Sequence, residues 1–271
     1  MISVVNLGRV DYSSAQELQK TLVDLRKQNR ISDVLLLLEH TPVITLGRNA
    51  KENNIVASRE LLASREVEVV DCDRGGDVTF HGPGQLVAYP IFDLRAFREK
   101  IGAVEFVRRL EEVLMLTCAF YGIATQRIKG MTGVWTNAEP PARARVEPRT
   151  SNAPWPERKI AAIGVHISRA VTSHGFALNV STDLDYFNLI VPCGLTKPVT
   201  SIEFETGQNP SLEEVMPVVT RHFGQVFQQQ VLWVESLNDL LPGIDIGAPQ
   251  DTPATAPRNL HELHGDDLFN V

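Results

Sequence analysis

Residues 74–90 read RGGDVTFHGPGQLVAYP, and the rest of the chain can be followed outward from this stretch. Its first twelve residues include four glycines and a proline, so a packed helix cannot run through them. Residues 86–94 are apolar and favour a strand. Glycine lets a ligand approach the backbone closely, and Arg74, Thr79 and His81 supply polar groups beside it. The stretch therefore predicts either a ligand-binding loop or an elaborate turn with an exposed arginine.

The overall composition is that of an ordinary globular protein, because 43% of the 271 residues are hydrophobic and 22% are charged. A net charge of −7 argues against nucleic acid or an anionic membrane as the main partner. Three widely spaced cysteines, Cys72, Cys118 and Cys193, indicate neither a disulfide framework nor a cysteine-rich zinc site and fit the reducing cytoplasm. We expect no signal peptide and no membrane-spanning run.

The hydrophobic pattern predicts alternating strands and helices before residue 74. Strands are expected at residues 2–7, 34–38, 43–46 and 67–70, and helices from Ser13 or Ser14 to about residue 28 and over residues 60–64. The turn at residues 40–42 contains a proline and separates two apolar strands, which predicts a hairpin.

After residue 90 the pattern predicts a helix at 103–121, a pair of strands within 159–180, a short strand at 189–195 and a helix at 212–226 that Pro217 interrupts. Residues 138–158 hold five prolines and are expected to form an exposed insertion between two strands. The chain beyond residue 235 is polar. We therefore predict one α/β domain, residues 1–235, and a loose tail, residues 236–271.

Cys193 is the candidate nucleophile, because it lies at a Pro-Cys-Gly turn after an apolar run. A thiol needs help to ionise at neutral pH, and His81, His166, His174 and Lys159 are possible helpers. Lys159 begins an apolar strand, which would desolvate its ammonium group and lower its pKa. The alternatives are a small buried cysteine and a solvated lysine at a strand end.

Three blocks of the sequence together resemble the octanoyltransferases of lipoate biosynthesis, the lipoyl(octanoyl) transferase family. They are RGGDVTFHGPGQLVAYPIFDL at 74–94, KIAAIGVHISRAVTSHGFALNV at 159–180 and IVPCGL at 190–195. The resemblance covers residues 7–233 and leaves out the insertion and the tail. It implies an α/β (α+β) fold with a central mixed sheet flanked by helices, similar to biotin and lipoate protein ligases.

The resemblance also implies a reaction. Cys193 would take an octanoyl group from octanoyl-acyl carrier protein as a thioester, and a lysine of a lipoyl domain would then accept it. Lys159 would lower the pKa of the thiol and move its proton. The acceptors would be lipoyl domains of 2-oxoacid dehydrogenases and the glycine cleavage H protein. No ATP, metal or other cofactor is expected, and we expect a cytoplasmic monomer.

The substrate-binding positions implied by the resemblance are Arg74, Gly75, Gly76, Asp77, Val78, Thr79, Phe80, His81, Ala162, Ile163, Gly164, Gly175, Phe176 and Ala177. The small residues among them would leave a groove for an alkyl chain, with Ile163 and Phe176 as apolar walls. Backbone N–H groups of Gly75 and Gly76, or of Gly164, are candidates to stabilise an oxyanion. His174 and His81 could position the substrate.

Two other functions remain open at this point. An ATP-dependent lipoate ligase on the same fold would not need Cys193, and a non-catalytic module could bind acylated carrier protein. Docking of an acidic carrier protein on a negatively charged chain would need a local basic patch, for which Arg48, Arg74 and Lys197 are candidates.

Overall fold

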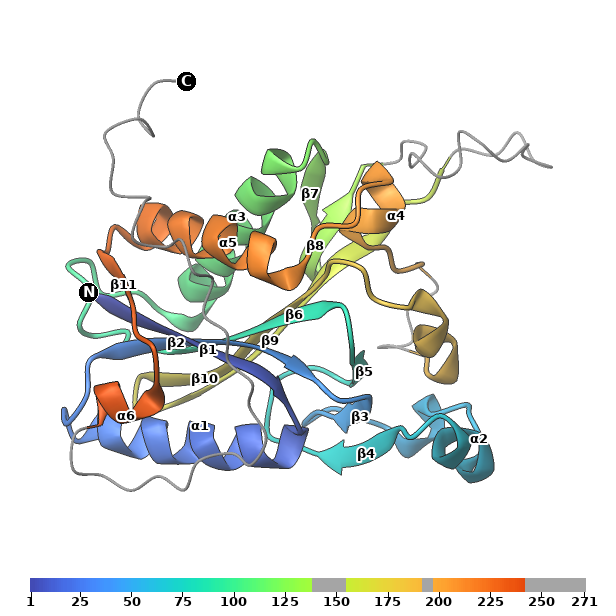
Figure 1. The fold of residues 1–271 in the computed structure, drawn as a ribbon, viewed down its shortest axis with the longest axis horizontal. Helices are drawn as coiled ribbons and strands as arrows, with labels where there is room; N and C mark the ends of the chain where they lie inside the picture. The colour runs from blue at the N-terminus through green and yellow to red at the C-terminus, as the bar shows by residue number, and fades with distance from the viewer. Residues whose placement is uncertain (138–154, 192–196, 242–271) are drawn as a thin grey trace.

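The computed structural model describes residues 1–137, 155–191 and 197–241. In this part of the chain the strands form two sheets, shown in Figure 1. The large sheet has the strand order β11 (Val231–Trp233), β1 (Ile2–Val10), β2 (Asp33–His40), β6 (Gln85–Ile91), β10 (Val171–Asn179), β9 (Lys159–Ser168), β8 (Met131–Thr136) and β7 (Thr125–Ile128). It is mixed, because β1 runs parallel to β2 and β11 whereas β2, β6, β10, β9, β8 and β7 pair antiparallel.

Helices cover both faces of the large sheet (Figure 1). On one face pack α3 (Ala103–Phe120) and α5 (Leu212–Phe227), and on the other α1 (Tyr12–Lys27) and α6 (Leu237–Leu240). The period-two alternation of β2 assigns its leucines to the two faces, since Leu35 and Leu37 belong to the α3/α5 cluster and Leu36 and Leu38 to the α1 cluster. A strand buried on both faces explains the continuous aliphatic run.

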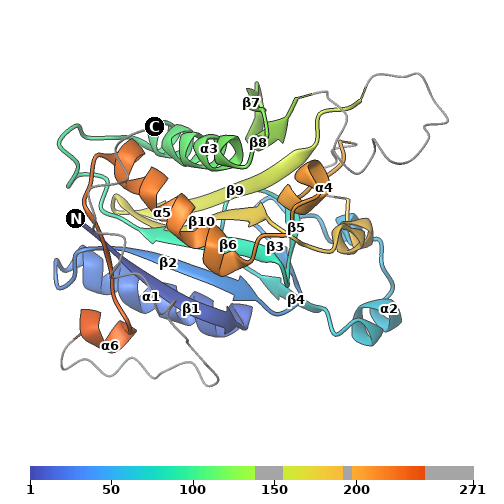
Figure 2. The same cartoon turned by 45° about the horizontal axis from the view of Figure 1, so that its top comes forward.

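A small sheet lies at one end of the large one, as Figures 1 and 2 show. Its order is β4 (Glu68–Asp71), β3 (Val43–Leu46) and β5 (Val78–His81). A third hydrophobic cluster joins it to α2 (Arg59–Ser64) and to a 3₁₀ helix, Leu184–Leu189. The remaining short helices are a 3₁₀ helix, Glu52–Asn54, and α4, Ile202–Thr206. No helix in the described ranges is long and apolar enough to cross a membrane.

The alternation of strands and helices agrees with the expectation, but two local predictions in the N-terminal half are wrong. β2 and β3 do not form a hairpin, because β3 pairs with β4 and β5 instead. His40, the last residue of β2, is buried opposite Val10 of β1, with its Nδ1 atom 2.8 Å from the Val10 carbonyl oxygen, so β2 stays paired in the large sheet to its end. The first helix is capped by Asp11, whose carboxylate accepts the N–H of Ser14, rather than by Ser13 or Ser14.

Two further expectations, on Pro217 and on the strand at 189–195, need correction. α5 is continuous through Pro217, because the buried face of the helix (Val215, Val219 and Phe223) offsets one missing hydrogen bond. The strand expected at 189–195 is absent at its start, where Leu189 ends a 3₁₀ helix and Ile190 forms an isolated bridge with Ile55; residues 192–196 lie outside the described part.

The tail expected from residue 236 is not loose at its start. α6 begins after Ser236, which caps it, and Leu237 and Leu241 are buried against the α1 face. Residues 242–271, and residues 138–154 of the expected insertion, lie outside the described part. The insertion point itself is confirmed, since it falls between β8 and β9.

Phe223 offers a test of the α3/α5 core. Its ring is fully buried and stacks on Phe176 and Phe227. We expect Phe223→Ala to lower the free energy of unfolding by about 3–5 kcal/mol, measured by chemical denaturation. Phe120→Ala is the matched control, because Phe120 is 56% exposed and its loss should cost less than about 1 kcal/mol. Equal losses in the two variants would contradict this packing.

Candidate active site

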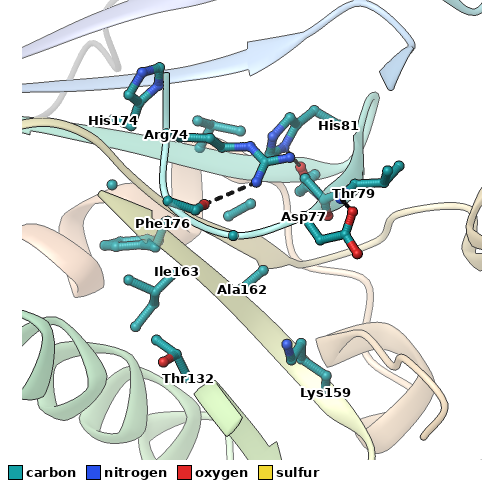
Figure 3. Close-up of a pocket in the computed structure, with 18 of the residues that line it drawn as sticks. Arg74, Asp77, Thr79, His81, Thr132, Lys159, Ala162, Ile163, His174 and Phe176 are labelled. Atoms are coloured by element: carbon teal, nitrogen blue, oxygen red, sulfur yellow. Dashed lines mark hydrogen bonds between the residues drawn. The ribbon is translucent and has the colours of Figure 1, made fainter. Parts of the chain in front are cut away.

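A cavity of about 330 Å³ lies between the glycine-rich loop and one face of the large sheet (Figure 3). Its floor is a row of small side chains that crosses three strands, with Ala162 of β9 opposite Ala177 of β10, and Ala177 opposite Val87 of β6. In the next row Gly164 lies opposite Gly175. Because side chains two residues apart share a face of a sheet, these rows form one shallow apolar floor.

The roof of the cavity is the loop before β5, and Arg74 holds it in place. The Arg74 side chain is 7% exposed and donates hydrogen bonds to the Thr45 carbonyl oxygen (2.7 Å), the Thr45 hydroxyl (2.8 Å) and the Gly75 carbonyl oxygen (3.1 Å). The Gly75 N–H donates to the Val165 carbonyl oxygen of β9 (3.2 Å). The stretch is therefore a loop laid over a sheet, and the alternative of a turn with an exposed arginine is wrong.

Gly164 allows this close approach. A Cβ atom at Gly164 would lie 2.7 Å from the Gly75 carbonyl oxygen, which is closer than real Cβ contacts. The glycine therefore serves the seating of the loop on β9 rather than the width of the groove.

A β-bulge turns Lys159 into the cavity. Val134 of β8 pairs with Ala161 while Trp135 pairs with Lys159, so β9 has one extra residue at Ile160. Ile160 and Ala161 both pack in the α3/α5 cluster, which leaves Lys159 on the cavity side with Ala162. The Lys159 Nζ atom lies 4.7 Å from the centroid of the Trp135 ring, a cation–π contact.

The side of the cavity opposite Lys159 is polar and aromatic. His81 donates from Nδ1 to the Gln85 side-chain oxygen (2.7 Å), and Gln85 donates to the Asn179 side-chain oxygen (2.9 Å). Tyr12 stacks on His81 with ring centroids 6.1 Å apart. Burial lowers the pKa of His81 well below its ordinary value, so its ring is neutral at pH 7.

His40 lies behind this wall. Its ring accepts the Tyr89 hydroxyl at Nε2 (2.7 Å) and donates from Nδ1 to the Val10 carbonyl oxygen. Burial lowers the pKa of His40 to about 4.

Most of the positions implied by the resemblance border this cavity. Those that do are Lys159, Arg74, Gly75, Gly76, Asp77, Val78, Thr79, His81, Ala162, Ile163, Gly164, Gly175, Phe176 and Ala177. Phe80 does not: it alternates to the other side of β5 and stacks on Tyr186 at 4.6 Å in the third cluster. Cys193 lies outside the described residues.

The expected apolar walls are also different. Alternation directs the side chains of Ile163 and Phe176 to the opposite face of the sheet, where Phe176 stacks on Phe223. Phe187 supplies apolar wall instead, and Val87 extends the floor. Of the proposed basic patch, Arg74 is buried and Lys197 is bonded to Glu157 (2.6 Å), so only Arg48 is exposed as expected.

Sequence reasoning missed part of the lining: Tyr12, Gln85, Val87, Tyr89, Gly130, Met131, Thr132, Asn179, Phe187 and Val199. Gln85, Val87 and Tyr89 alternate along β6, so their period of two was a usable signal. Tyr12 and Met131 reach the cavity through tertiary packing and carry no local signal. Of the candidate helpers, His166 lies outside the cavity, with Nε2 3.8 Å from Asp73.

Comparison with known proteins shows the family of this chain. The family model described as the lipoyl protein ligase A/B catalytic domain matches residues 11–224. An octanoyltransferase of Koribacter versatilis is 64% identical over 269 residues, 99% of each chain. One from Acidobacterium capsulatum is 54% identical over 250 residues, 89% of this chain and 96% of the relative. The chain belongs to the octanoyltransferases of the lipoyl protein ligase A/B family. It is therefore an acyltransferase.

Solved structures of lipoate protein ligases share the fold. A lipoate-protein ligase A bound with ATP superposes with a TM-score of 0.64 over 87% of this chain and 89% of its own, at 13% identity. A bipartite lipoate protein ligase from Thermoplasma acidophilum gives 0.62 over 86% of both chains, also at 13% identity. These confirm the expected mixed α/β architecture of an octanoyltransferase.

The contact between Gly164 and the loop can be tested by adding a side chain. We expect Gly164→Ser to lower the free energy of unfolding by about 1–3 kcal/mol and to displace the loop, because the new Cβ meets the Gly75 backbone. Gly102→Ser is the matched control: nothing lies within 4 Å of its Cβ position, and Ser is a good N-cap for α3. Thermal unfolding with hydrogen exchange at the Gly75 amide measures both effects. Unchanged protection in Gly164→Ser would contradict the proposed seating.

The buried histidines predict a loss of stability in mild acid. The folded chain keeps His40 neutral down to a pKa of about 4, whereas an unfolded histidine binds a proton below about pH 6.5. Between these values the unfolded state binds more protons, so the free energy of unfolding falls by about 1.4 kcal/mol per pH unit for each such histidine. Denaturation at pH 7.5, 6 and 5 measures the slope, which His40→Gln should reduce. An identical slope in that variant would show that His40 is not the buried histidine that causes the loss of stability.

Proposed function

We propose that this chain transfers an octanoyl group from octanoyl-acyl carrier protein to a lysine of lipoyl domains, through a thioester on Cys193. The observation that carries the proposal is a lysine, Lys159, turned by a bulge into an apolar-floored cavity in a chain 64% identical to an octanoyltransferase. The acceptors are lipoyl domains of 2-oxoacid dehydrogenases and the glycine cleavage H protein. The reaction uses no ATP and no metal.

The acyl chain lies on the floor formed by Ala162, Ala177 and Val87. This floor is apolar, and the loop above it excludes water from the chain. At about 0.8 kcal/mol for each buried methylene, an eight-carbon chain gains several kcal/mol there. The depth of the cavity can therefore select substrates by the length of their acyl chain.

The two ends of the segment that carries Cys193 support its assignment as nucleophile. Residues 192–196 are outside the described part. Before them the Val191 N–H donates to the Asn54 carbonyl oxygen (2.7 Å), and the Asn54 amide donates to Asp77 of the cavity loop (2.6 Å). After them the Pro198 carbonyl oxygen accepts the Lys159 N–H (2.9 Å). The described residues on the two sides of the segment thus bond to the roof of the cavity and to the strand of Lys159.

The chemistry proceeds in two balanced transfers. The Cys193 thiolate attacks the thioester carbon, the bond to the carrier sulfur breaks, and the leaving phosphopantetheine thiolate takes a proton from the Lys159 ammonium. The acceptor lysine amine then attacks the acyl-enzyme, gives its proton to Lys159 and releases the Cys193 thiolate. Each step passes through an oxyanion. The Gly75 N–H is already donated to Val165 and Gly164 lies in the ladder opposite Gly175, so Gly76 is the glycine we retain as oxyanion donor.

We assign this function to a single catalytic domain. Because α6 buries Leu237 and Leu241 against the α1 face, the domain extends to residue 241 rather than 235.

Intact mass after brief mixing with octanoyl-acyl carrier protein, without ATP, tests the proposal. We expect a gain of one octanoyl group that disappears when lipoyl domain is added. Cys193→Ala should give no adduct, while Cys72→Ala, which changes a half-buried thiol that does not line the cavity, should still form the adduct. If the protein gains no mass and acylates lipoyl domain only when ATP and free octanoate are supplied, the chain is a ligase and the proposal fails.

Lys159→Met tests the proton-transfer role. We expect the rate of octanoyl transfer to fall by about 10²–10⁴-fold, the usual contribution of a general acid–base group. Alkylation of Cys193 by iodoacetamide at pH 7 should slow in the same variant, because the ammonium no longer stabilises the thiolate. Unchanged alkylation would show that Lys159 does not activate the thiol.

A further inference from the structure

A second hollow, of about 300 Å³, lies beside the cavity between α1 and the strands β9 and β10. Polar and apolar atoms contribute equally to its surface, and its lining includes Gln16, Gln19, Lys20, Val23, Asp73 and His166. His174 borders this groove and also borders the acyl cavity. In Figure 3 His174 and Lys159 lie at opposite ends of the acyl cavity. The His174 ring therefore separates the far end of the cavity from the groove.

The backbone of His174 is unusual for a strand residue. Its φ is +53°, in the left-handed region that costs energy for any residue with a Cβ. Regular alternation would direct its side chain, like those of Phe176 and Leu178, to the α3/α5 face. The left-handed turn instead directs the backbone N–H to the Gln19 side-chain oxygen of α1 (2.7 Å) and the ring to the cavity.

The ring of His174 is fixed on two sides. Its Nε2 atom donates to the Asp73 carboxylate at 2.7 Å, and its ring makes a T-shaped contact with the Tyr89 ring, at an interplanar angle of 89° with centroids 6.1 Å apart. The residue is 4% exposed, so the ring fills the space between the two hollows. Asp73 directly precedes Arg74, so the anchored loop also holds the carboxylate that orients the ring.

We propose that the His174 ring, held by Asp73, is the end wall of the acyl cavity and sets the longest acyl chain that the enzyme accepts. This inference rests on the proposed function, in which the acyl group is attached at the Lys159 end and its methyl end extends away from it. The groove between α1 and β10 is the space that a longer chain would enter if the wall were removed. His174 and Asp73 are specificity-determining residues and take no part in the chemical step.

His174→Gly tests the wall with little effect on the backbone, because glycine adopts a positive φ without strain. We compare kcat/KM for dodecanoyl- and octanoyl-acyl carrier protein. Each additional methylene that becomes buried should add about fourfold, so we expect the dodecanoyl-to-octanoyl ratio to rise at least tenfold above the wild-type ratio. Lys20→Ala is the control, because Lys20 is an exposed residue that borders the groove and not the cavity, and its ratio should equal that of wild type.

Asp73→Ala is a second variant that does not threaten folding, since the Asp73 side chain is 57% exposed. It releases the ring without deleting it, and we expect the ratio to rise in the same direction by a smaller factor. Should His174→Gly fail to fold by circular dichroism, the Asp73→Ala result decides.

The outcomes separate this inference from the proposed function. If wild type transfers octanoyl groups and both variants keep the wild-type dodecanoyl-to-octanoyl ratio, His174 is not the end wall, and the proposed function remains intact. A ratio that rises equally in Lys20→Ala also overturns the end wall, because the effect is then not specific to the wall. If wild type forms no octanoyl adduct on Cys193, the proposed function fails and this inference fails with it.

Discussion

The candidate site depends on one contact in which two backbones meet with no side chain between them. Gly75 of the loop rests on Gly164 and Val165 of β9, and its N–H donates to the Val165 carbonyl oxygen. The guanidinium of Arg74 fixes the other side of the loop to Thr45 of the small sheet. The loop is thereby held between two sheets, above Ala162 and Ala177 of the floor. A roof, a floor and a cavity follow from this contact.

Two departures from regular β structure orient the side chains at the ends of that cavity. The bulge at Ile160 directs Lys159 into one end, and the left-handed backbone of His174 directs an imidazole into the other. In a regular strand pair alternation alone would decide both directions. Backbone irregularities of this kind are unfavourable in themselves and persist because surrounding contacts hold them, here the packing of Ile160 and the hydrogen bond from His174 to Gln19.

A chain of hydrogen bonds connects the polar wall to the strand of Lys159. Gln85 bonds to Asn179, the Asn179 amide donates to the Thr200 carbonyl oxygen, and the Thr200 N–H donates to the Lys159 carbonyl oxygen. Gln85 and Asn179, two buried polar side chains that line the cavity, are therefore hydrogen-bonded to each other, and Asn179 also to the Thr200 backbone, as buried polar groups usually are. These hydrogen bonds also connect the backbone of Lys159 to Gln85 of β6 and Asn179 of β10. The polar wall therefore helps to hold β9, the strand of Lys159, in place.

The sequence by itself determined the elements and much of the site. The aliphatic run of β2 indicated a strand buried on both faces. The glycine-rich stretch indicated a loop whose backbone a ligand can approach closely. Three motif blocks then identified the family. Of the site positions that they implied within the described residues, all except Phe80 border the cavity, because those positions are local to the motifs. Sequence periodicity reports which residues share a face and how buried they are.

Only the tertiary structure decided which surfaces meet. The pairing of β3 with β5 rather than β2, the burial of Arg74, and the direction of Phe80 away from the cavity depend on partners far along the chain. The same holds for Tyr12, which reaches the cavity from α1, and for the two irregular residues, whose strain is invisible in the sequence. A local pattern fixes a backbone preference and a face, whereas the partner of that face is chosen by the packing of the whole chain.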